Sequence, residues 1–213
     1  MAAVLCPSHK PLYLNIFPSW KGKQPLRFFL LEKLLEARKA SVFPTNGEEN
    51  DEDVNVFLAG LLTGFLRVRE DSLILPGAQC VLDPPAKNLS RGAQADHYLA
   101  NAHCRLLHLG LMDRGDNLRR RSVPFGMTRP EARQRDMQLG ATCYAMAANL
   151  LGQGRQVNSG LVAVYSKLAE KFPEYVQVLS VLATRHLGLG AQLSEHQLSR
   201  LLDEEYWDHA QAG

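Results

Sequence analysis

Apolar residues recur at helical spacing along most of this chain, and they almost nowhere alternate in the period-two pattern of a strand. In residues 25–40, for example, Leu26, Leu30, Leu34 and Ala37 fall on one stripe. Residues at this spacing lie on one face of the segment if the segment is an α-helix, and that face can then be buried. We therefore predict an all-α fold, a compact bundle of six to seven helices with an irregular N-terminal segment.

The stripes and their flanking residues set the expected helix boundaries. Thr128 and Glu131 have the spacing of a capping box, which opens a helix that should end at Gly152. We expect helices over residues 25–40, 54–69, 93–112, 128–151, 159–171, 173–187 and 194–207. The helix over 54–69 is apolar nearly all round, so it should lie buried near the middle of the fold. Its Gly60 and Gly64 should let another backbone come close.

We expect the 213 residues to form a single helical domain over 1–213, because a chain of this length buries a sizeable core without disulfides or metals. Residues 1–70 would form its N-terminal helical part. Residues 71–92 are rich in proline and would form a connector. Residues 93–209 would form a C-terminal helical bundle.

Composition and charge exclude several classes of protein. The longest apolar stretch, Val54–Leu66, has thirteen residues, whereas a membrane helix needs about 20. The 24 basic and 22 acidic residues nearly balance, so the overall charge does not point to a polyanion partner, although local patches of charge could still bind one. The four cysteines contain no CxxC pair, which argues against a disulfide framework or a zinc ribbon. We expect a soluble cytoplasmic protein that does not associate with membranes.

The predicted helix over 93–112 carries an ordered polar stripe opposite its apolar face. The apolar face comprises Ala95, Leu99, Ala102, Leu106 and Leu109, with His103 at its edge. The polar stripe comprises His97, Asn101, Cys104 and His108, and it would face solvent, a second helix or a partner subunit.

Within that stripe, Cys104 and His108 stand at i and i+4, so they could bind one metal ion. A zinc site needs a third and usually a fourth ligand, for which Cys143 and His186 are the plausible sources. A metal or thiol sensor is therefore an alternative, while no cofactor is expected.

An arginine-rich connector follows this helix. Its candidate binding residues for an anion or a partner are Arg114, Arg119, Arg120, Arg121 and Arg129. Arginine binds phosphate and carboxylate groups through its planar fork. The acids nearby neutralise part of the cluster, so a solvated loop and a nucleic-acid or other polyanion site both remain open.

The sequence contains none of the motifs that mark common catalytic sites. We find no GxxxxGK[ST], no GxSxG, no HExxH and no GxGxxG register. Whether the chain is an enzyme stays uncertain, with the balance against it. The leading hypothesis is a non-catalytic helical interaction module, a regulatory, scaffold or assembly subunit. It would act through contact with a protein partner or with itself.

Overall fold

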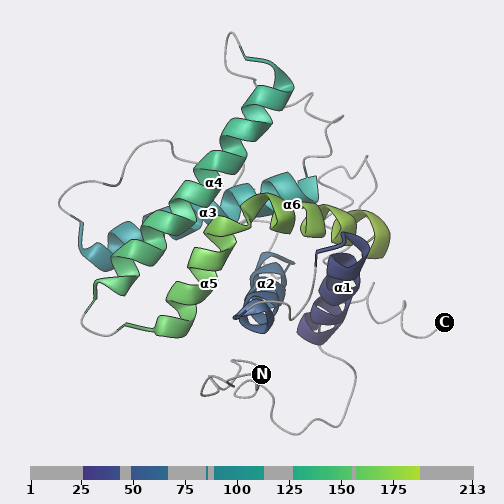
Figure 1. Cartoon of the computed structure of the whole chain (residues 1–213), viewed down its shortest axis with the longest axis horizontal. Coiled ribbons are helices and arrows are strands. Elements are labelled where there is room, and N and C mark those ends of the chain that lie inside the picture. The colour runs from purple at the N-terminus through teal and green to yellow at the C-terminus, as the bar shows by residue number, and fades with distance from the viewer. Residues whose placement is uncertain are drawn as a thin grey trace, which may run out of the picture.

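The predicted all-α fold is confirmed in the computed structural model, which describes residues 26–43, 49–66, 85, 89–112, 127–154 and 157–187 (Figure 1). These residues form six α-helices, and no strand occurs among them. The α-helices are α1 Leu26–Ala40, α2 Asp51–Leu66, α3 Arg91–Leu107, α4 Arg129–Gly152, α5 Ser159–Glu170 and α6 Phe172–Val181. α3 and α6 each continue into a π-helical turn, η4 His108–Met112 and η6 Leu182–His186. The helix predicted over 194–207 lies outside the described residues.

Local side-chain bonds fix where several helices begin. The predicted capping box of α4 forms, with the backbone N–H of Thr128 donating to Oε2 of Glu131 at 2.7 Å. This bond, together with a bond from the Thr128 hydroxyl to the same oxygen, lowers the pKa of Glu131 below its ordinary value. α3 begins after Ser90, whose hydroxyl accepts from the N–H of Ala93, and α5 begins after Asn158 in the same way. α4 ends at Gly152, as its sequence predicts.

α2 is more enclosed than α1, as the apolar residues on nearly all of its faces predict. It lies between α1 and α5, and most of its residues from Asp51 to Thr63 are buried (Figure 1). The core around it draws on every α-helix, with Leu30, Leu34, Leu58, Leu62, Leu106, Tyr144, Leu168, Phe172 and Leu179 almost fully enclosed. Burial of these side chains from water is the main source of the fold's stability.

Two glycines let α6 approach its neighbours. A Cβ on Gly110 in η4 would lie 2.5 Å from the Cβ of Leu179, and a Cβ on Gly140 in α4 would overlap the ring of Phe172. The prediction for Gly60 and Gly64 was wrong. The space over Gly60 is filled by the Arg27 guanidinium, because a long side chain can occupy the groove that small residues leave.

Candidate functional site

The polar stripe of α3 lies largely inside the chain. Asn101 is 7% exposed and Cys104 is 4% exposed, so this part of the stripe packs within the described fold. The amide of Asn101 donates to the carbonyl of His97 at 2.9 Å, and its Oδ1 accepts from Arg105 at 3.1 Å. Arg105 in turn lies 3.8 Å from Asp136 of α4. Hydrogen bonds within α3 thus orient Arg105, whose ion pair with Asp136 links α3 to α4.

The predicted metal pair gains no further ligand from the described residues. Cys104 is a buried reduced thiol, and His108 is half-buried at the start of η4. Of the two further ligands considered, Cys143 is a half-buried thiol on α4, and His186 contacts Glu36 on α1. Among the described residues, no group of three or more histidine, cysteine, aspartate or glutamate side chains could hold a metal ion.

Of the five arginines in the predicted cluster, the described residues include only Arg129. Arg114, Arg119, Arg120 and Arg121 lie outside the described residues. Arg129 is the first residue of α4 and so begins a regular helix. The charge cluster therefore leads directly into the start of α4.

The first turns of α4, residues 128–139, form what we call the α4 arm. Among the arm's described side chains none is buried, and burial begins at Gly140. Figure 1 shows this end of α4 extending beyond α3, α5 and α6. Its half-buried residues are Ala132, Arg133, Asp136, Met137 and Leu139. The exposed Met127 precedes the arm, with its sulfur 4.0 Å from Arg135. The arm is tied to the rest of the fold through the ion pair of Asp136 with Arg105.

A buried charge network, which the sequence pattern did not predict, joins α1, α2 and α5. Asp51 Oδ1 lies 2.8 Å from Lys167 Nζ and 3.5 Å from Arg38 Nη2. Arg38 also donates to Asn55 Oδ1 at 2.7 Å, and Lys167 donates to the carbonyl of Glu49 at 2.8 Å. One sign was present in the sequence: Arg38 continues the apolar stripe of α1. A charged residue in such a position requires a buried partner.

The guanidinium of Arg38 also lies between aromatic rings. The guanidinium carbon, Cζ, is 4.4 Å from the ring centroid of Phe43 and 5.6 Å from the ring centroid of Tyr175. The two rings meet edge to face, with centroids 5.1 Å apart. Aromatic faces stabilise a cation that has left water. The network is therefore a structural joint that locks the ends of α1 and α2 onto α5 and α6.

A second buried group, which we call the His103 cluster, comprises Phe57, His103, Tyr144, Tyr165 and Phe172. The ring of His103 lies 5.6 Å from those of Phe57 and Tyr144. Tyr144 stacks on Tyr165 at 6.0 Å and contacts Phe172 at 6.1 Å. The cluster therefore brings together one ring from each of α2, α3, α4, α5 and α6.

The polar atoms of this cluster are poorly satisfied. Nε2 of His103 and the hydroxyl of Tyr144 are buried, and neither has a hydrogen-bond partner among the described residues. Burial lowers the pKa of His103 to about 4, so the imidazole is neutral at physiological pH. Burial, and then the neighbouring Tyr165, raise the pKa of Tyr144 well above its ordinary value.

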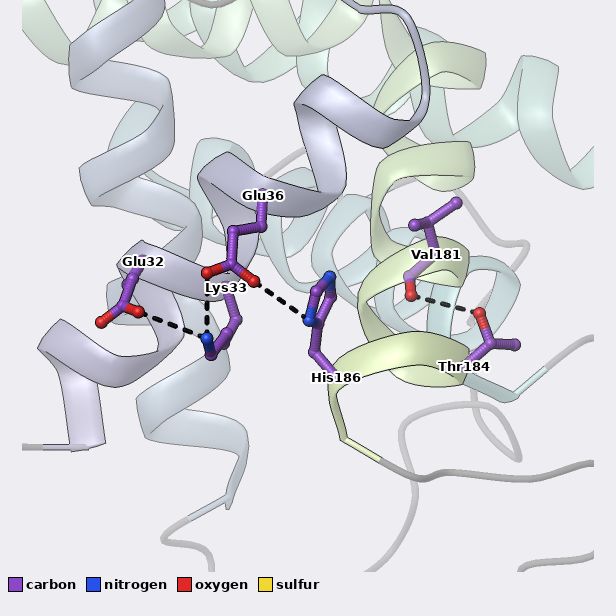
Figure 2. Close-up of polar contacts among 6 residues, drawn as sticks. All are labelled: Glu32, Lys33, Glu36, Val181, Thr184 and His186. Carbon is purple, nitrogen blue, oxygen red and sulfur yellow. Dashed lines mark hydrogen bonds and ion pairs between the residues drawn. The ribbon is translucent and has the colours of Figure 1, made fainter.

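An exposed row of charges links α1 to the end of α6. Figure 2 shows Lys33 between Glu32 and Glu36, and His186 reaching Glu36 from η6. The Lys33 ammonium lies 2.9 Å from Glu36 and 3.2 Å from Glu32, and these bonds raise its pKa. Exposed pairs of this kind contribute little stability.

Comparisons with known proteins assign no function to any of these groups. No protein-family model, no curated protein and no solved structure matches the chain. Separately, none of the described helices has the length and apolar character to cross a membrane.

Proposed function

We propose that the protein is a non-catalytic helical module that acts by binding another protein, and that the α4 arm makes this contact. The supporting observation is the contrast within α4. From Gly140 onward the helix packs into the core, whereas none of the described side chains of the arm is buried. Short helices are marginal in water without tertiary packing, so an ordered arm gains from a partner surface.

The composition of the arm suits a protein partner. Methionine and arginine are enriched in protein interfaces, whereas lysine and glutamate are depleted. The arm and the residue before it carry Met127, Arg133, Arg135 and Met137, and they contain no lysine. The arm's glutamate, Glu131, accepts the capping bonds of Thr128. Methionine adapts its shape to varied surfaces, which favours recognition of another side-chain surface.

Site-directed photo-crosslinking in cells tests this proposal. A photoreactive residue would replace Gln138, which is exposed on the arm, and in a control protein it would replace Ser166, which is exposed on α5. We expect a discrete heavier protein species from the Gln138 position alone, and its loss when Met127→Asp, at an exposed position, is added. Equal crosslinking from both positions, or none from Gln138, would reject the proposal.

Two other outcomes distinguish the alternatives. A species of twice the 23.7 kDa chain would identify the partner as a second copy. A crosslink to nucleic acid would favour polyanion binding through Arg114, Arg119, Arg120, Arg121 and Arg129, which stays a prediction. That alternative also requires that salt weakens retention steeply. The proposal includes a cytoplasmic location, supported by four cysteines whose spacing lacks the pattern of a disulfide framework.

A further inference from the structure

His103 is a titratable side chain at the point where five helices meet. Its ring contacts Phe57 of α2 and Tyr144 of α4, and the cluster extends through Tyr165 of α5 to Phe172 of α6. The α4 arm lies outside this cluster. The role inferred for His103 is therefore separate from the proposed partner contact.

The surroundings of His103 accept the neutral ring and oppose the charged one. A protonated imidazole has two N–H donors, and both require an acceptor or water. Nε2 has no partner among the described residues. Of the two rings in contact with His103, Phe57 offers no acceptor, and the hydroxyl of Tyr144 makes no hydrogen bond to it. Protonation at this position therefore places an unsatisfied charge inside the fold.

Charged groups on the surrounding helices do not offset this effect. Lys167 of α5 is bound to Asp51, and Arg105 of α3 is paired with Asp136. Both are cations, so they disfavour a further positive charge. Residues 137–152 of α4 contain no charged side chain. The remaining acidic side chains on the elements that form the cluster are Glu52 and Asp53 of α2, Asp96 of α3, Glu131 of α4, Glu170 of α5 and Glu174 of α6. Burial, and then Asp96, raise the pKa of Tyr165 above its ordinary value.

The geometry also indicates which side of the cluster gives way. Tyr144 and Phe172 are fully buried, whereas Phe57 and His103 retain some exposure. Water therefore reaches His103 most easily past Phe57. Phe57 is also the ring through which α2 contacts Tyr165, at 5.5 Å. A further tie from α2 to α5 is the Asp51–Lys167 pair at the start of α2.

We propose that His103 is an acid-sensitive switch: when the imidazole takes up a proton, Phe57 leaves His103 and Tyr165, and the middle of α2 lifts off α5. Helices α3 to α6 keep their structure in the open form, because the rings of Tyr144 and Phe172 remain enclosed. The opened form exposes the apolar faces of Phe57 and Tyr165. The switch responds below neutral pH, since burial keeps the proton off His103 at pH 7.

The test combines two titrations of the full chain between pH 7 and pH 2.5. Histidine ring resonances in NMR spectra report the protonation of His103, and fluorescence of the dye ANS reports exposed apolar surface. We expect ANS fluorescence to rise several-fold at the pH where His103 titrates, while far-UV circular dichroism stays unchanged. The His103→Phe variant cannot protonate, so its ANS transition should move lower by about one pH unit or more.

Matched variants keep the test decisive. His186→Gln removes a histidine that pairs with Glu36 at the surface, and it should leave the ANS transition where it is in the wild type. His103→Leu serves if the phenylalanine variant is not folded at pH 7. The proposal is overturned if His103→Phe or His103→Leu opens at the wild-type pH. It is also overturned if helicity is lost together with the rise in ANS fluorescence, because that result indicates global unfolding.

Discussion

Val42 holds a backbone conformation that its side chain disfavours, and replacing it with glycine should stabilise the protein. Its φ is 55°, in the left-handed region, and its side chain is 90% exposed. The N–H of Phe43 donates to the carbonyl of Arg38 at 3.1 Å, and the N–H of Val42 donates to that of Lys39 at 3.3 Å. These two bonds form a Schellman motif at the end of α1, with Val42 at the position that usually holds glycine.

The magnitude follows from three contributions. The left-handed conformation costs an L-residue about 1–2 kcal/mol, and β-branched residues lie at the upper end. Glycine removes this strain but makes the unfolded chain more flexible, which offsets about 0.4–1 kcal/mol. Little burial is lost because the valine is exposed, and both backbone bonds remain. Val42→Gly should therefore raise the free energy of unfolding by about 1 kcal/mol, which corresponds to about 2–4 °C in Tm for a chain of this size.

Urea denaturation followed by circular dichroism measures this difference. The midpoint should rise without a change in the m-value, because the area exposed on unfolding is the same. Ala40→Gly is a matched control, since it adds glycine two residues earlier, at the last residue of α1, and it should lower stability by up to about 1 kcal/mol. If Val42→Gly is no more stable than the wild type, the strain argument is wrong.

Three further predictions concern the packed interior. Gly140→Ala should lower the free energy of unfolding by about 1–3 kcal/mol in the same assay, because the new Cβ meets a buried ring, whereas Gly64→Ala meets no atom within 4 Å and should not destabilise. Lys167→Met leaves Asp51 without its closest cation, and thermal unfolding should show a loss of about 3 kcal/mol. The pKa of His103 is lowered on folding from 6.5 to about 4, so the unfolded state binds more protons between these values. Stability should therefore fall as pH drops through this window, by up to about 3 kcal/mol, and His103→Leu should show a shallower pH dependence.

The positions of the helices could be predicted because their signals are local. Apolar period, capping residues and terminal glycine all act within one or two turns, so α1, α4 and α5 appear where the sequence places them. α2 begins at Asp51 rather than near residue 54, because its acidic residues form the first turn instead of preceding it. α3 begins two residues early at Arg91, since Ser90 supplies a cap that the apolar pattern does not reveal.

The buried polar groups could not be predicted in the same way, because their partners lie far apart along the chain. Lys167 bonds a carbonyl 118 residues away, and Arg38 bonds a side chain 17 residues away. Periodicity places Arg38 on the buried stripe of α1, but only the tertiary fold supplies Asp51 and Asn55. The same holds for His103, which helical spacing places beside the apolar stripe. Its contact with Phe57 and its unsatisfied Nε2 appear only when α2 packs on α3.

The contrast along α4 connects these observations to function. Beyond Gly140 the helix supplies Tyr144, Ala147 and Ala148 to the core, so packing alone suffices to hold it. The α4 arm has less of that support, because its described side chains are at most half-buried and Met137 packs on the core from its edge. The Thr128–Glu131 bonds at its start and the pairing of Asp136 with Arg105 add to its order. Side-chain bonds of this kind contribute about 1 kcal/mol each, less than the burial of one large apolar residue. A partner that covers the arm would therefore add more stability to α4 than its own caps do, which is the physical basis for placing the contact there.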